Sequence, residues 1–288
     1  MCDEQQLARW AKEGITRRHF GVGALAGVAV ACAPSESAAG ESGDGRLAEG
    51  KVAFTTPDGT MDGEFYHPAT GKHPGVIFWT DIAGIRPAKR EMARRLAAAG
   101  YAVLLANPYY RDVAGQQFAD FADFAGNGGW GKVTPWRSKF TVATVQTDAR
   151  ACAEWLLGQD AVDAERGIGT QGYCMTGGFA VAAPSAHDSI RAGASFHGGG
   201  LVRAEGASPH KVLRGGAHYL IAIGQNDDAS APGDKDALRA AADAAGATAQ
   251  IEVYPADHGW CVPDSPSYDE IQAERAWSRL LELYRTAL

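Results

Sequence analysis

Short apolar segments alternate with helical patterns from about Leu47 to the end of this chain. Such an alternation indicates a parallel sheet covered by helices on both faces, because parallel strands need crossover connections that are usually helical. We therefore predict an α/β fold with a mostly parallel central sheet. The strand candidates are Val52–Thr55, Gly63–His67, Val76–Thr80, Ala102–Ala106, Gly167–Gln171, Ala194–His197, Tyr219–Gly224 and Gln250–Tyr254.

The segments between these strands carry helix signals. Pro87 opens one helix and Gly100 stops it, since proline is favoured in a first helical turn and glycine just past the end. The other expected helices cover about Lys139–Leu157, start just after Cys174, cover about Lys235–Ala245, and end the chain with Ala273, Trp277, Leu280 and Tyr284 on one face. The stretch Tyr109–Pro135, rich in Gly, Phe and Trp, is expected to be a loop that shapes a substrate entrance.

Length and charge limit the number of domains and the kinds of partner. With 288 residues, one catalytic domain over residues 47–288 is the simplest organisation. The formal net charge of −7 repels phosphate backbones, and no basic stripe interrupts it. We therefore expect no nucleic-acid partner, and the sequence carries no signal for an oligomeric state.

The N-terminus resembles a twin-arginine export signal. Thr16-Arg17-Arg18-His19-Phe20 begins an uncharged apolar run that ends near Ala33, which is shorter than the roughly 20 residues that cross a bilayer. We expect a signal segment over residues 1–33, a flexible linker over residues 34–46, and export to the periplasm or cell envelope. Cys32 ends a loose lipoprotein box, so a lipid anchor at Cys32 is the one membrane attachment that the sequence suggests.

The five cysteines do not form an obvious disulfide framework. Cys2 and Cys32 belong to the signal segment, and Cys152 lies on the apolar stripe of a predicted helix, where it is expected to pack in the core. Cys174 and Cys261 stand in motif-bearing stretches. A bridge between Cys152 and Cys261 stays open as an alternative.

The segment Thr170–Gly178 has the form of a nucleophile elbow, in which a strand ends, one residue turns and a helix begins. The turn needs Gly172 and a small residue two positions after the nucleophile, because the two backbones approach closely there. Cys174 occupies the central position, where a helix N-terminus favours the thiolate. The N–H of Met175 is placed to donate to an oxyanion.

A thiol at an elbow needs a base and an orienting acid. His258, in the loop after the last strand candidate, is the candidate base, and Asp227 follows the preceding strand candidate. Asp228 is the alternative acid. The order of nucleophile, acid and histidine is the one that α/β-hydrolases use.

At these residues the chain resembles the dienelactone hydrolase family. The resemblance rests on the elbow Gly172–Met175, the acid turn Gly224–Asp227, and His258 followed by a C-terminal helix that contains Ala276-Trp277, and it covers about Leu47 to the end. It implies an α/β-hydrolase fold without a large cap domain. It also implies hydrolysis of an ester or lactone through a Cys174, Asp227 and His258 triad and a thioester acyl-enzyme. We expect no cofactor, and no metal either, because the sequence has no Cys-x-x-Cys pair, His-Glu-x-x-His helix or His-x-His strand pair.

The same resemblance suggests further roles around the triad. The N–H of Ile82 would be the second oxyanion donor, and Asp81 stands where the family has a glutamate that contacts the resting thiol. Arg111 could represent the first of two arginines that bind a substrate carboxylate in the family. The second arginine, expected shortly after the histidine, is missing, because His258 is followed by Gly259-Trp260-Cys261.

Three further residues and two other function classes complete the predictions. Tyr173, His197 and Trp260 are candidates for contact with the substrate or the resting thiol, although a turn role for His197 is an equal alternative. One rival function is a non-catalytic envelope protein that binds a ligand on a hydrolase scaffold. The other is a thiol redox protein in which Cys261 approaches Cys174 through the fold.

Overall fold

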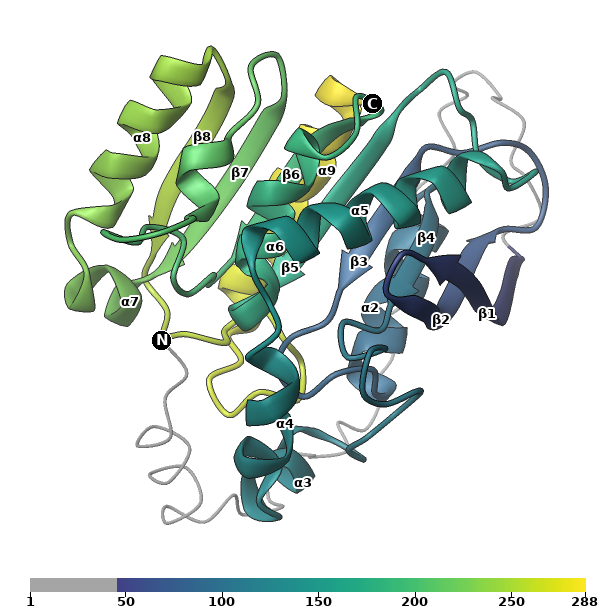
Figure 1. Ribbon diagram of the computed structural model, residues 1–288, viewed down its shortest axis with the longest axis horizontal. Coiled ribbons are helices and arrows are strands. Elements are labelled where there is room, and N and C mark those ends of the chain that lie inside the picture. Colours follow the sequence, from purple (N-terminus) through teal and green to yellow (C-terminus); the bar gives the residue numbers. More distant parts are fainter. Residues whose placement is uncertain (1–45) are drawn as a thin grey trace, which may run out of the picture.

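The computed structural model describes residues 46–288, and these residues form one eight-stranded sheet (Figure 1). The twin-arginine segment, Cys2, Cys32 and the linker as far as residue 45 lie outside the described residues. The sheet order is β1-β2-β4-β3-β5-β6-β7-β8. The strands are β1 Leu47–Thr56, β2 Gly59–Pro68, β3 Gly75–Trp79, β4 Ala102–Ala106, β5 Ile168–Tyr173, β6 Ile190–Phe196, β7 His218–Gly224 and β8 Thr248–Tyr254.

The sheet is mostly parallel, as the alternating pattern predicts. β1 pairs with β2 and β2 with β4 in antiparallel register, whereas every pairing among β3 to β8 is parallel. Each of the eight strand candidates corresponds to one strand of the sheet. The carboxyl ends of β3 to β8 therefore share one edge, and the loops after these strands meet there.

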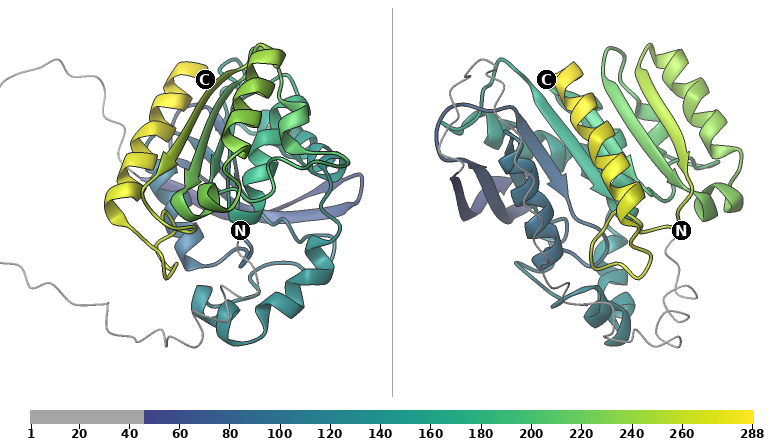
Figure 2. Two further views of the ribbon diagram at one scale, coloured as in Figure 1. Left: turned by 90° about the vertical axis from the view of Figure 1, so that its left-hand side faces the viewer. Right: turned by 180° about the vertical axis from the view of Figure 1, so that it is seen from behind.

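Helices cover both faces of the sheet. Helices α2 and α9 lie on one face and α5, α6 and α8 on the other, as the views from the front and from behind show (Figures 1 and 2). The two faces arise because side chains alternate along each strand: Val76 and Phe78 pack on the side of α2, and Ile77 and Trp79 on the side of α5. The bounds are α2 Pro87–Ala98, α5 Val142–Leu157, α6 Gly177–Ala182, α8 Asp234–Ala245 and α9 Glu270–Ala287.

The prediction of a loop over Tyr109–Pro135 is wrong. This segment contains helix α3, Phe121–Gly126, and most of helix α4, Gly129–Arg137. The side chain of Asp120 caps α3 by accepting the Asp123 N–H at 2.7 Å, which is a local signal that the loop prediction overlooked. Both helices lie beyond the carboxyl ends of the strands (Figure 1), and among the described residues no larger cap domain covers this edge.

Two further features concern helices. The acid turn after β7 forms a short helix, α7 Gln225–Ser230, that was not predicted. Within residues 46–288, no helix is both long and apolar enough to span a bilayer.

The packing of α6 on the sheet can be tested at Gly193 of β6. A Cβ at this position would lie 2.3 Å from the carbonyl oxygen of Ala180 in α6. We expect Gly193→Ala to lower the free energy of unfolding by about 1–3 kcal/mol, because a buried backbone contact must open. Gly50→Ala is the matched control, since a Cβ at Gly50 would meet nothing within 4 Å. Equal urea midpoints for the two variants would contradict this contact.

Candidate active site

Cys174 occupies a strained turn at the carboxyl end of β5. Its φ is 55°, in the left-handed region that non-glycine residues rarely adopt. It starts the 3₁₀ helix Cys174–Thr176, which leads directly into α6. A Cβ at Gly172 would lie 2.1 Å from the carbonyl oxygen of Thr176, so only glycine fits there. This is the elbow geometry that the sequence predicts.

Thr176, two residues after Cys174, ties the elbow to the neighbouring strand. Its hydroxyl donates to the carbonyl of Thr80, just after β3, at 2.6 Å, and it accepts the N–H of Tyr173 at 3.0 Å. Thr176 is fully buried. The side chain therefore contributes two hydrogen bonds that a glycine at this position would lack.

His258 lies between the predicted acid and the thiol. Its Nδ1 donates to Asp227 at 2.8 Å and 3.1 Å, and its own N–H donates to the Asn226 side chain at 2.8 Å. Asp228, the alternative acid, instead binds Lys235 at 2.7 Å. The structure thus brings Asp227, and not Asp228, to the histidine.

The charge state of His258 depends on its two neighbours. Burial opposes the charged form, yet the charge of Cys174 and the hydrogen bond and charge of Asp227 raise the pKa of His258 to about 9. Burial also opposes the charged form of Asp227, and the hydrogen bond and charge of His258 outweigh it, so that its pKa is lowered. At neutral pH the raised pKa of His258 and the lowered pKa of Asp227 therefore favour an imidazolium beside a carboxylate.

A cavity of about 400 Å³ opens over Cys174 and His258. This volume suits a small organic substrate. Its walls are largely apolar, and they come from the residues just before α5, from α5 and α6, and from the segment after β6. The apolar lining residues are Phe140, Val142, Val145, Phe179, Ala182, Val202 and Pro209.

Ile82 and Met175, the predicted oxyanion donors, line this cavity together with Cys174. Tyr109 contacts both residues without lining the cavity: its hydroxyl donates to the Ile82 carbonyl at 2.8 Å and contacts the Met175 sulfur at 3.6 Å. Sequence reasoning missed Tyr109. Its position directly after the strand Ala102–Ala106, at the carboxyl edge of the sheet, is the signal that could have found it.

Asp81 lies near the thiol, but its carboxylate forms ion pairs with two basic side chains. It contacts Arg86 at 2.6 Å and Lys89 at 2.9 Å, and it accepts the N–H of Ala83 at 3.0 Å. Burial favours the neutral acid, and the charges of Arg86 and Lys89 overcome this and lower the pKa of Asp81. Asp81 also borders a cavity of about 10 Å³ shared with Cys174, His197 and His258. The predicted resting-state position is thus occupied by a buried ion cluster.

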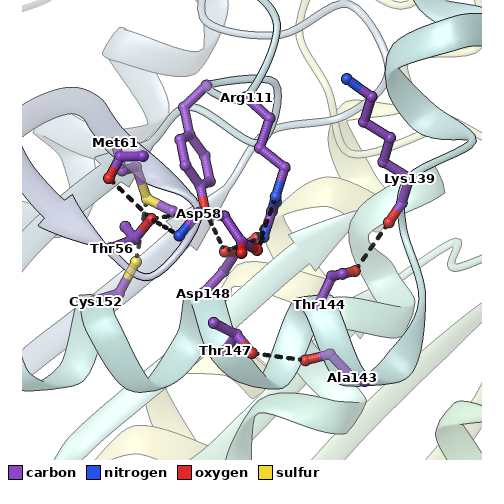
Figure 3. A network of polar contacts seen from close by, with 12 residues as sticks. Thr56, Asp58, Met61, Arg111, Lys139, Ala143, Thr144, Thr147, Asp148 and Cys152 are labelled. Atoms are coloured by element: carbon purple, nitrogen blue, oxygen red, sulfur yellow. Dashed lines mark hydrogen bonds and ion pairs between the residues drawn. The ribbon is translucent and has the colours of Figure 1, made fainter.

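The structure places Arg111 outside the cavity that contains Cys174. Its guanidinium points to Asp58 and Asp148, at 2.6 Å and 2.7 Å (Figure 3). Because two carboxylates already bind it, Arg111 is not available as the substrate clamp that the family resemblance suggested. Arg111 lies on the segment that joins β4 to α3.

Two other arginines line the cavity, and sequence reasoning missed both. Arg137 ends α4 and stacks over the Trp130 ring at 4.8 Å, and Arg203 donates to the Gly200 carbonyl at 3.3 Å. Neither forms an ion pair with an acidic side chain within residues 46–288. No local pattern in the sequence distinguished them from ordinary surface arginines.

The remaining three candidates, Tyr173, His197 and Trp260, are buried. Tyr173 stacks between Phe78 and Phe196, and Trp260 stacks on Tyr254 at 5.0 Å. His197 lies between these aromatic residues and His258. The ring centroids of His197 and His258 are 4.7 Å apart. None of the three lines the 400 Å³ cavity.

The three described cysteines form no disulfide. Burial raises the pKa of Cys152 well above its usual range and that of Cys261 to about 12. Cys152 contacts the sulfur of Met61 at 3.5 Å, in the core, as its apolar stripe predicted (Figure 3). Among residues 46–288 no group of three or more His, Cys, Asp or Glu side chains is arranged to hold a metal ion.

Comparisons with known proteins identify relatives of this chain. Two relatives named "Putative carboxymethylenebutenolidase" are each 26% identical: one from Salmonella typhi over 265 residues and one from Escherichia coli strain K12 over 266 residues. Each match covers 90% of this chain and 94% of the relative. A crystal structure described as "Putative Dienelactone Hydrolase", from Klebsiella pneumoniae, is 26% identical with a TM-score of 0.68, and the match covers 83% of this chain and 99% of that one. The model of the "Dienelactone hydrolase family" matches residues 61–288, which is most of the sequence, and the chain therefore belongs to the dienelactone hydrolase family.

Proposed function

We propose that the protein hydrolyses an ester or lactone with Cys174 as nucleophile, His258 as acid and base, and Asp227 as the orienting carboxylate. The observation that carries the proposal is the position of His258, which hydrogen-bonds Asp227 and lines a substrate-sized cavity together with Cys174. The geometry matches the general arrangement of nucleophile, base and orienting group.

The proposed reaction proceeds in two acyl-transfer steps. The Cys174 thiolate attacks the carbonyl carbon, and the N–H groups of Ile82 and Met175 stabilise the oxyanion. His258 gives its proton to the leaving oxygen, which leaves a thioester on Cys174. Neutral His258 then takes a proton from water, the hydroxide attacks the thioester, and the acid product departs as the thiolate re-forms.

The cavity also suggests the chemistry of the substrate. Apolar walls favour a compact hydrocarbon body, and Arg137 and Arg203 present positive charge at the same cavity. A carboxylate or similar anionic group on the substrate would complement these arginines. Relatives named as carboxymethylenebutenolidases are consistent with an acidic lactone or ester.

The redox alternative has less support than hydrolysis. Cys261 borders a different cavity, with Tyr173 and Trp277, and its high pKa disfavours a resolving thiolate. The other alternative, a protein that only binds a ligand, would not require Asp227 to orient His258 beside Cys174.

We further propose that the protein is exported by the twin-arginine route, with residues 1–33 as the signal and residues 34–46 as the linker. The motif Thr16–Phe20 and the short apolar run support this. A lipid on Cys32 would then attach the exported protein to the membrane.

Replacement of Arg17 and Arg18 by lysine tests the export signal. It should retain the protein in the cytoplasm in a fractionation assay.

Cys174→Ala tests the nucleophile. We expect it to reduce turnover of short aryl esters and enol-lactones by at least about a hundredfold, because covalent catalysis is lost. Wild-type protein quenched during turnover of an activated ester should show the added acyl mass on the peptide that contains Cys174. Cys152→Ala is the matched control and should keep its activity, since Cys152 lies in the core. Unchanged turnover in Cys174→Ala would refute the assignment.

The charge coupling between Cys174 and His258 predicts a titration shift. In the wild type, NMR titration should give His258 a pKa of about 9, so that the ring is protonated at neutral pH. In Cys174→Ala the charge that raises the pKa is gone while burial still lowers it, so the midpoint should fall. Cys152→Ala should leave the midpoint where it is. A midpoint that does not respond to Cys174→Ala would show that the two side chains are uncoupled.

Arg137→Gln and Arg203→Gln test the anionic part of the substrate. Each should raise KM for a carboxylate-bearing lactone by about tenfold and leave KM for a neutral ester of similar size nearly unchanged, because hydrogen bonds to charged groups contribute about 1.5–3 kcal/mol. Lys132→Gln removes the same charge from α4 at a position that does not line the cavity, and serves as the control. Equal effects on charged and neutral substrates would contradict the role of the arginines.

A further inference from the structure

One short segment after β6 holds the peptide of Cys174 on both sides. The Cys174 N–H donates to Nδ1 of His197 at 3.1 Å, and the Cys174 carbonyl accepts the N–H of Gly199 at 3.2 Å. The same segment touches the start of α6, where a Cβ at Gly177 would lie 2.5 Å from Cα of Gly198. The backbone of the nucleophile is therefore fixed by a part of the chain that is remote in sequence.

The His197 ring is buried, and its hydrogen bonding is directed to the Cys174 peptide. The side chain is 1% exposed, and its Nε2 has no hydrogen-bond partner within residues 46–288. In that part of the chain, the contact with Cys174 is thus the only hydrogen bond of the ring. The backbone of His197 is itself strained, with a φ of 40°, and its N–H is held by the carbonyl of Ala222 at 2.8 Å.

The direction of the hydrogen bond determines the tautomer of His197. Because a backbone N–H donates to Nδ1, this nitrogen must carry a lone pair, and the proton of the neutral ring is on Nε2. Burial and the neighbouring His258 lower the pKa of His197 well below its usual value, which keeps the ring neutral. At neutral pH the His197 ring is therefore neutral, whereas the His258 ring is protonated.

We propose that His197 is a positioning residue, whose Nδ1 lone pair holds the Cys174 peptide in its left-handed turn and so keeps the thiol directed at His258. The inference rests on the proposed role of Cys174 as nucleophile. His197 does not line the 400 Å³ cavity. It acts through Cys174 and leaves substrate binding unchanged.

A pair of amide substitutions separates the two ring nitrogens. In His197→Asn the side-chain oxygen can take the place of Nδ1, whereas in His197→Gln the polar atoms lie at the distance of Nε2 and the Nδ1 acceptor is lost. We expect His197→Gln to lower kcat on an aryl ester by roughly 10- to 100-fold with KM within about twofold. His197→Asn should keep kcat within about threefold of the wild type.

Because asparagine tolerates a positive φ better than glutamine, a third variant separates backbone strain from the lost acceptor. His197→Gly has no steric penalty at positive φ and also lacks the acceptor, so it should be as impaired as His197→Gln. Wild-type kcat in His197→Gly, or an Asn variant as slow as the Gln variant, would overturn the proposal.

A measurement on the unaltered protein avoids dependence on folded variants. Nitrogen NMR of histidine-labelled wild-type protein should show His197 as the Nε2–H tautomer throughout pH 5–9. An Nδ1–H tautomer, or a midpoint for His197 inside this range, would refute the proposal even if all variants unfold. Activity loss in Cys174→Ala is independent of this signal, so failure of the proposed function and failure of the His197 inference give different results.

Discussion

The active site depends on a close backbone contact between the start of α6 and the segment after β6. A side chain on Gly177 would collide with Gly198 and Ser195, and one on Gly198 would lie 2.3 Å from the Ser195 hydroxyl. With both glycines in place, the chain can come near enough for His197 and Gly199 to bind the peptide of Cys174. The strain at Cys174 is thereby held by packing that involves two neighbouring strands, β5 and β6.

A second constraint joins the two loops that carry the other reactive groups. Asp81 binds Arg86 and Lys89, and Arg86 also binds Asp264 at 2.7 Å. Arg86 and Lys89 are fully buried, so the loss of one partner would leave an uncompensated charge, which typically costs about 3–5 kcal/mol. The cluster connects the loop after β3, which contains Ile82, to the loop after β8, which contains His258. The cluster can thus fix the distance between Ile82, the proposed oxyanion donor, and His258, the proposed base.

Local patterns were sufficient where the physics is local. The elbow was predictable because glycine at position 172 is required by a contact only four residues away, with Thr176. Asp227 and His258 were predictable because each follows a strand whose carboxyl end lies at one edge of a parallel sheet. Local patterns failed for α3, where the cap at Asp120 was overlooked. The family resemblance failed for Arg111, whose partners Asp58 and Asp148 are separated from it by 53 and 37 residues.

The sequence by itself determined the α/β architecture, the order of the eight strands along the chain, and that Asp227 and His258 lie together on the side of the sheet where Cys174 turns. Only the tertiary structure decided that Arg137 and Arg203 face the cavity. It also decided that Asp81 forms ion pairs with basic side chains and that His197 accepts the N–H of Cys174. The physical reason is range. Strand, helix and turn preferences act over a few residues, whereas the partner of a buried charge or ring nitrogen is set by which distant segments the sheet brings side by side.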